Sequence, residues 1–321
     1  AGLGLYSISY LCTKIRLMTE IGNKDTFRTE KTGGRISNLS SDVQLLIWWG
    51  LFLGMFFVAQ IVSSIVIVAF YQTAEIGDLA KNPDNLNPLR YAQMMATLIG
   101  FLLPALIFQR LKFGKETGFN HANAVFPMYL LLLVPAMLYT LYAVIDISFF
   151  VNKWMPWSDW MKDAQQQYKA LVEAIMDNTS VSVLVLNLIT VAVLPAVAEE
   201  LLFRGSLQRL LTERMNIHVA VLISSVFFSL IHFEFSGFLP RVILGMFLGY
   251  LFYYTGNIMV SIFAHLVNNG AQVIFMYLNK IGMYKINVED PVMPKTGSFI
   301  LYTATFAVLW AVFIILLKKK K

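Results

Sequence analysis

Two adjacent glutamates and an arginine interrupt an otherwise apolar stretch of this sequence. Glu199 and Glu200 follow eighteen residues, 181–198, that carry no charged side chain, and Arg204 comes four positions after Glu200. Residues four apart are neighbours on a helix surface, and glutamate before arginine is the favourable order for an ion pair. Because Glu199 points about 100° away from Glu200, Arg204 can neutralise one carboxylate while the other accepts a proton. The spacing predicts a supporting role for Glu200 and makes Glu199 a candidate general base.

Five further polar side chains occur inside apolar runs of the sequence. His232 lies in the run FFSLIHF, and His265 and Asn269 lie in the run SIFAHLVNNG. Ionisable groups at membrane depth carry a high energetic penalty, so their presence there indicates function. His265 and Asn269 are four residues apart and therefore share one face of a helix. Asn187 and Asp146 are lesser members of the same group.

The positions of the turns predict that these groups meet. A turn near 215–216 places Glu199 before it and His232 after it at almost equal separations in the sequence. At about 1.5 Å per residue, both lie roughly 24–26 Å along antiparallel helices from that turn. A second turn, at 255–257, places the other two side chains roughly 12–18 Å along the next helix. We therefore expect the four groups to share one layer of a helical bundle.

Each group also has a less specific explanation. The glutamates and Arg204 can belong to a solvated helix end, because polar residues continue beyond them. His232 can be an interfacial histidine beside Glu234. His265 and Asn269 can simply hydrogen-bond to neighbouring helices, as such side chains commonly do in membranes.

Histidine and glutamate are also ligands of hydrolytic zinc sites. The sequence contains no HExxH motif, and the candidate ligands are spread over three expected helices. The single cysteine, Cys12, excludes a zinc site made of several thiolates and an intramolecular disulfide. We expect no cofactor, with zinc as the remaining alternative.

The composition is that of a membrane protein. Of the 321 residues, 57% are hydrophobic and 14% are charged, whereas soluble domains carry about 25% charged residues. The mean hydropathy is +0.64. We predict an all-α, polytopic bundle of about eight transmembrane helices, since a span needs about 20 apolar residues. The candidate spans are about 45–71, 91–108, 125–148, 181–203, 219–233, 238–255, 258–279 and 299–317.

The chain divides into a tail, 1–42, and a single membrane domain, 43–321, with the polar motifs at about 181–279. The segments 72–90 and 151–180 are expected to be loops, and the tryptophans of the second suit a membrane interface. The first residues lack the basic region of a signal peptide, so we expect an ordinary tail.

The basic residues predict the orientation, because lysine and arginine are enriched in cytoplasmic connections. With eight spans, most of them fall on the side of the two termini, which we therefore expect to be cytoplasmic. No basic groove with interleaved aromatic residues is present, so the net charge of +6 suggests membrane lipids rather than nucleic acid as a partner. The basic residues on that side are Lys14, Arg16, Lys24, Arg28, Lys31, Arg35, Arg110, Lys112, Lys115, Arg204, Arg209, Arg214 and Lys318–Lys321.

Three short motifs together resemble the CAAX protease and bacteriocin-processing family, which includes the type II CAAX prenyl endopeptidases. They are EELLFRG at 199–205, FSLIH at 228–232 and HLVNN at 265–269. Each motif is weak alone, but all three occur in the family's order. The resemblance covers roughly residues 181–279.

The resemblance implies an intramembrane endopeptidase of the glutamate type, with eight helices and a cavity open to the cytoplasm. By this resemblance, Glu199 and His232 activate a water. His265 and Asn269 stabilise the oxyanion, and Glu200 and Arg204 are supporting residues. The implied substrate is a membrane-presented peptide or a lipid-anchored protein. The expected location is a bacterial cytoplasmic membrane.

Two other classes of function compete with a protease. In a non-catalytic scaffold or bacteriocin-immunity protein, the polar cluster would only lock the bundle together. A transporter of small solutes or ions can also use intramembrane carboxylates, but the sequence lacks the inverted repeat or the helix broken by paired Gly and Pro that many transporters contain.

Overall fold

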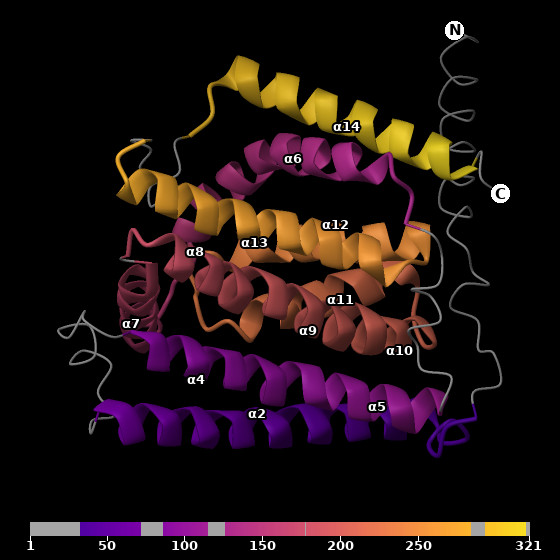
Figure 1. The fold of residues 1–321 in the computed structure, drawn as a ribbon. Coiled ribbons are helices and arrows are strands. Elements are labelled where there is room, and N and C mark those ends of the chain that lie inside the picture. The colour runs from indigo at the N-terminus through magenta and orange to yellow at the C-terminus, as the bar shows by residue number, and fades with distance from the viewer. Residues whose placement is uncertain (1–32, 72–85, 115–125, 177, 284–292, 319–321) are drawn as a thin grey trace, which may run out of the picture.

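The computed structural model describes residues 33–71, 86–114, 126–176, 178–283 and 293–318, and this part of the chain is helical without a strand (Figure 1). The all-α membrane bundle expected from the sequence is confirmed. Most of the expected tail, and residues 72–85 of the expected loop 72–90, lie outside the described residues. The last four residues of that expected loop are helical, because α4 (Asn87–Thr97) begins there.

Seven helical rods are long and apolar enough to cross a membrane, which makes this a multi-pass membrane protein. Two of them, α4–α5 and α8–α10, each consist of α-helical segments joined without a break by short π-helical turns. The seven are α2 (Ser41–Tyr71), α4 (Asn87–Thr97) with α5 (Leu103–Phe113), α6 (Leu130–Lys153), α8 (Val181–Asn187) with α9 (Leu194–Leu202) and α10 (Arg209–Thr212), α12 (Phe238–Thr255), α13 (Ile258–Lys280) and α14 (Thr296–Lys318).

The fifth expected span is shorter than predicted. Helix α11 (Ile217–Leu230) has 14 residues, fewer than the roughly 20 that cross a bilayer. It is followed by a turn that carries His232, and Phe233 in this turn has a φ of 52°, which is unusual for a residue with a side chain. Helix α11 therefore ends within the bundle, and the chain returns through α12.

The prediction that 151–180 is a loop is wrong, because α7 (Asp159–Met176) forms there. It carries too many charged residues to be a membrane-spanning helix. Its apolar residues nevertheless recur on one face, and Leu171, Val172 and Ile175 pack against other helices. Arg90 also donates to the Ile175 carbonyl, which satisfies one of the carbonyls left free at a helix C-terminus.

The motif-bearing helices lie in the middle of the bundle. Figure 1 shows α2 and α4–α5 on one side and α6 with α14 on the other, with α8–α13 between them. The apolar core reflects this order, since one cluster joins α2 and α5 to α9 and α11, and another joins α6 and α14 to α12 and α13. The polar side chains are therefore enclosed by apolar helices on both sides.

Both predicted turns are confirmed. Asn216 precedes α11, and its side chain accepts a hydrogen bond from the Val219 amide at 3.0 Å. Asn257 precedes α13 and accepts from the Met259 amide at 2.9 Å. Between α12 and α13, Gly256 adopts the left-handed conformation with a φ of 63°, which glycine tolerates without steric penalty. These turns set the depth of the polar groups.

Candidate functional site

Glu199 lies opposite two histidines. The distance from Glu199 Oε2 is 3.7 Å to His232 Nε2 and 4.0 Å to His265 Nε2. Glu199 is 8% exposed, which contradicts the alternative of a solvated helix end. Within the described part of the chain, its Oε2 atom has no hydrogen-bond partner. Three helical segments far apart in the sequence thus converge on one carboxylate.

The hydrogen bond of His232 determines which ring nitrogen carries the proton. His232 Nδ1 lies 2.7 Å from the Phe228 carbonyl oxygen. A carbonyl can only accept, so Nδ1 must be the donor. In the neutral ring, Nε2 is then an acceptor, and it faces the carboxylate of Glu199. Two acceptors that face each other at this distance can both be satisfied by one water molecule that donates to each.

Glu200 is held by three donors and is completely buried. Its Oε1 atom accepts from Arg204 Nη1 at 2.8 Å and from His265 Nδ1 at 2.9 Å. Its Oε2 atom accepts from the hydroxyl of Ser261. The predicted pair with Arg204 is confirmed in geometry. A carboxylate so fully engaged is poorly suited to take a proton from a substrate.

Arg204 connects this network to the neighbouring helices. Its second terminal nitrogen donates to the Gly245 carbonyl on α12 at 2.9 Å. Its guanidinium lies 4.6 Å from the centre of the Phe228 ring, within the range of a cation–π contact. Arg204 thus fixes Glu200 relative to α11 and α12.

His265 links the two glutamates. Its Nδ1 atom bonds to Glu200, while its Nε2 atom is directed toward Glu199. His265 can donate from Nε2 only when both ring nitrogens carry protons, and Glu200 is then its counter-ion. The side chain is 3% exposed, so both of its ring nitrogens face the two carboxylates inside the bundle.

The side chain of Asn269 is anchored to a backbone carbonyl that a proline leaves without its usual helical donor. Its amide nitrogen donates to the Val191 carbonyl at 3.1 Å. In a regular α-helix that carbonyl would accept from residue 195, but Pro195 has no N–H, and the turn Leu188–Val193 is π-helical. Asn268 donates to the Asn269 side-chain oxygen at 3.0 Å, and Tyr142 donates to Asn268 at 2.8 Å. The Asn269 amide is therefore fixed in orientation.

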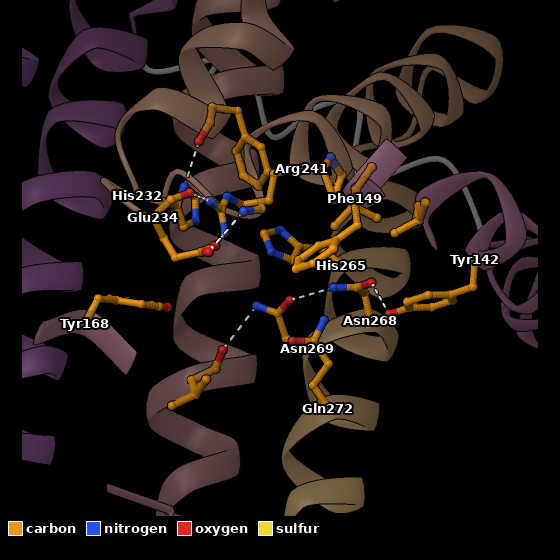
Figure 2. A pocket seen from close by; sticks show the side chains of 16 residues that line it. Tyr142, Phe149, Tyr168, His232, Glu234, Arg241, His265, Asn268, Asn269 and Gln272 are labelled. Carbon is orange, nitrogen blue, oxygen red and sulfur yellow. Dashed lines mark hydrogen bonds and ion pairs between the residues drawn. The ribbon is translucent and has the colours of Figure 1, made fainter. Parts of the chain in front are cut away.

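A cavity of about 400 Å³ lies beside these groups (Figure 2). Its lining includes His232, His265 and Asn269, and Figure 2 shows Tyr142 and Tyr168 at opposite sides of it. Glu199 is not a lining residue, but it lies within 4.0 Å of two that are. The structure thus brings the four predicted side chains to one enclosed place.

The two lesser candidates do not line the cavity. Asn187 accepts a hydrogen bond from buried Arg90 at 2.7 Å, which is an interhelical contact. Asp146 is not among the cavity-lining residues.

Sequence reasoning did not find three polar residues of the site. Ser261 precedes His265 by four positions and so shares its helix face, a signal that was available. Asn268 lies in the recognised HLVNN motif but was not assigned a role. Tyr142 comes from α6, and no local pattern connects it to the motifs.

The comparisons with known proteins agree with the motif resemblance. A family model described as "Type II CAAX prenyl endopeptidase Rce1-like" matches residues 181–271. The chain is also similar to "Putative membrane peptidase YdiL" of Bacillus subtilis (strain 168), with 32% identity over 112 residues. These residues are 35% of this chain and 45% of that protein, so the chain spans less than half of this relative's length. No solved structure matches the chain. The resemblance inferred from the motifs is confirmed for the central helices.

Proposed function

We propose that this chain is a membrane-embedded endopeptidase in which Glu199 is the general base. The observation that carries the proposal is the facing pair of acceptors, Glu199 Oε2 and His232 Nε2, 3.7 Å apart beside the cavity. The resemblance of the central helices to CAAX-type endopeptidases and to a membrane peptidase supports it.

The proposed reaction is the hydrolysis of a peptide bond by a water held between Glu199 and His232. Glu199 takes one proton, and the water oxygen attacks the carbonyl carbon, whose π electrons move to the carbonyl oxygen. When the tetrahedral intermediate collapses, the C–N bond breaks and the proton passes from Glu199 to the leaving amine. General acid–base catalysis of this kind contributes typically about 10²–10⁴-fold to a rate.

His265 and Asn269 are the proposed donors to the oxyanion. Asn269 uses one N–H on Val191 and has a second N–H available in its amide. Doubly protonated His265 offers Nε2–H on the same side of the cavity. Donors that are fixed before the reaction stabilise the developing negative charge most effectively, and Glu200 with Arg204 holds His265 in place.

No cofactor is part of this proposal. Among the described residues, no group of three or more His, Cys, Asp or Glu is arranged to hold a metal ion. We expect cleavage by the purified protein to persist after dialysis against EDTA, which would fail if zinc activates the water.

The substrate proposed here is a protein or peptide presented at the membrane, with or without a lipid anchor. The proposed location is a bacterial cytoplasmic membrane, with both termini on the cytoplasmic side and the surrounding lipids as contacts.

The experiment that tests the function is terminal proteomics of membranes that contain wild-type protein or Glu199→Gln. This substitution removes the negative charge and changes the shape very little. We expect new protein termini with wild type, and their loss with Glu199→Gln, while both proteins show the same thermal unfolding in detergent.

Equal cleavage by Glu199→Gln would show that Glu199 is not the base. If neither protein produces new termini, and Glu199→Gln has a changed unfolding temperature, the non-catalytic scaffold is favoured. The buried network around Glu200 is the observation on which that alternative rests. A transporter would instead produce solute flux in proteoliposomes, which we do not expect.

A further inference from the structure

The bundle has two distinguishable ends. At one end, here called the Glu213 end, Glu213 bonds to Lys112 and to Ser41, and Arg214 pairs with Asp42. The start of α2, the end of α5 and the turn between α10 and α11 therefore meet there. At the other end, here called the Asn152 end, the C-terminal turn of α6 and helix α7 contact the turn that carries His232.

Three contacts define the Asn152 end. Asn152 is completely buried, and its amide nitrogen donates to the carbonyls of Phe235 and Ser236 at 2.8 Å each. Gln165 on α7 accepts from the Ser236 amide at 3.0 Å. The His232 turn thus lies at the level where α6 leaves the membrane domain.

The cavity belongs to the Asn152 end. Besides Val191 and four residues of α13, its wall is formed by the later half of α6, by α7, by the last turn of α11 with the turn after it, and by the first turns of α12. Figure 2 shows Tyr168 of α7 and Arg241 near the start of α12 around the same space as His232 and His265. The lining residues that belong to these segments are Tyr142, Ile145, Phe149, Tyr168, Phe228, His232, Glu234, Gly237, Pro240, Arg241 and Leu244.

Both ends of the described chain lie at the Glu213 end. Residues 33–40 precede α2, and the Ile36 amide bonds to the Leu111 carbonyl near the end of α5 at 3.1 Å. The last helix, α14, runs in the same sense as α12, and Trp310 in its later half contacts Tyr254 at the end of α12. Figure 1 shows α7 and the end of α14 on opposite sides of the bundle.

The sequence charges distinguish the two sides. The connections on the side of the Asn152 end are mixed in charge, with acidic residues as common as basic ones. The Glu213 side has the basic tails and connections already described, except for Arg204, which lies inside the bundle, and it has fewer acids. In the sequence, the charged residues of the segments that join helices on the side of the Asn152 end are Glu75, Asp78, Lys81, Asp84, Arg90, Lys153, Asp159, Lys162, Asp163, Lys169, Glu173, Asp177, Glu234, Arg241, Lys280, Lys285, Glu289, Asp290 and Lys295.

We propose that the cavity opens on the extracytoplasmic side of the membrane and takes peptide segments presented there. Lysine and arginine are retained on the cytoplasmic side, which places the Glu213 end inside and the cavity outside. The motif resemblance implies a cavity open to the cytoplasm. The cavity and the two ends of the described chain lie at opposite ends of this bundle, so they cannot both face the cytoplasm. The substrate class is then an exported protein, a lipid-anchored protein of the outer leaflet or an extracytoplasmic loop. Only this substrate class rests on the proposed protease function.

Single-cysteine labelling tests the placement without any need for catalysis. In a Cys12→Ser background, Trp154→Cys reports the Asn152 end and Gly33→Cys reports the Glu213 end, because both positions are exposed. Tyr168→Cys reports the cavity itself. The probe is a membrane-impermeant maleimide added to spheroplasts, before or after permeabilisation, and labelling is measured by gel shift.

We expect Trp154→Cys and Tyr168→Cys to be labelled in intact spheroplasts, and Gly33→Cys only after permeabilisation. Labelling of Gly33→Cys alone in intact spheroplasts would place the cavity in the cytoplasm and overturn the proposal. Equal access to Gly33→Cys and Trp154→Cys would contradict the two-ended arrangement. Labelling of Trp154→Cys without Tyr168→Cys would show that the cavity does not open there.

The substrate class has a separate readout. The termini that depend on Glu199 should map to extracytoplasmic segments, and Glu199-dependent termini in cytoplasmic segments would overturn this part of the inference. If no termini depend on Glu199, the proposed function fails, while the labelling result still decides the orientation.

Discussion

At the scale of single residues, the charge that the structure holds most tightly is not the proposed base but its neighbour. Glu200 accepts from three side chains on two helices, and Arg204 bonds across to α12. The Oε2 atom of Glu199 has no such donors in the described part of the chain. A carboxylate with few donors is the better proton acceptor, since hydrogen bonds to the charged form reduce its basicity.

The buried pair makes Arg204 a stability residue. We expect Arg204→Met to destabilise the protein by about 3–5 kcal/mol, because it leaves Glu200 as an uncompensated buried charge. The double variant Arg204→Met with Glu200→Gln should recover part of this loss. The measurement is the unfolding temperature in detergent micelles. A single variant as stable as wild type would show that the pair does not support the fold.

Helical geometry explains which residue-scale features were predictable. The Glu200–Arg204 pair and the common level of Glu199 and His232 follow from fixed rise and rotation along helices. The partners of the site from α6 were not predictable, because Asn152 reaches the His232 turn across 83 residues of sequence. Contacts of this kind depend on which helices pack together, and apolar runs of similar composition do not encode that choice visibly.

At the scale of elements, the turn after α11 is held from outside the motif region. Asn152 also accepts from the Leu239 amide at 3.0 Å, so one side chain serves three backbone groups. The Trp157 ring packs 5.5 Å from the Phe235 ring and donates to the Asn152 carbonyl at 3.2 Å. The segment predicted to be a loop therefore positions the histidine.

We expect Asn152→Leu to release the His232 turn while the bundle stays folded. Leucine has a similar size but leaves the three backbone groups without partners, and each buried polar group left without a partner costs about 1–3 kcal/mol. Modification by diethyl pyrocarbonate, read by mass spectrometry, should become faster at His232. His265 should stay unreactive, since it is buried unless the whole bundle opens.

The matched control for this variant is Ser148→Ala. Ser148 lies one turn earlier on α6, is buried, and bonds to the Ile145 carbonyl of its own helix. It should leave the reactivity of His232 unchanged. If Asn152→Leu also leaves His232 as slow as in wild type, Asn152 does not position the imidazole.

Close packing of α11 and α12 depends on two glycines one turn apart. A Cβ atom on Gly245 would lie 2.9 Å from the Cβ of Ser225, and one on Gly249 would lie 3.1 Å from Val221 Cγ1. Small residues with this spacing allow helix backbones to approach in membranes. The Gly245 carbonyl can therefore reach Arg204, and the turn after α11, which carries His232, lies near Glu199.

We expect Gly245→Ala to destabilise the protein by about 1–3 kcal/mol, as overpacking does in close-packed interiors. Gly270→Ala is the control, because a Cβ there meets no atom within 4 Å and alanine is the better helix former. The unfolding temperatures of the two variants in one detergent give the comparison. Similar temperatures for both would show that α11 and α12 can separate without loss.

At the scale of the whole molecule, the apolar composition specified a helical bundle but not the direction of its cavity. Length and hydropathy predicted about eight spans, whereas seven helices of the described chain are able to span. The length of α11 was overestimated because its apolar run continues into the turn. The side on which the cavity opens emerged only when α6, α7 and the His232 turn were found together.

Under the proposed function and orientation, cleavage in intact cells should follow external pH. Glu199 exchanges protons through the cavity with the aqueous phase that the cavity faces, and a protonated carboxylate cannot act as a base. Acidifying the medium at constant internal pH should therefore slow the Glu199-dependent production of termini. Acidifying the cytoplasm with a permeant weak acid, at constant external pH, should leave this rate unchanged. The apolar core of α2, α5 and α9 separates Glu199 from the cytoplasm at the Glu213 end.

The rate of appearance of a Glu199-dependent terminus, measured by mass spectrometry under external and under internal acidification, decides between the two sides. A rate that follows internal pH would mean that the site takes its protons from the cytoplasm.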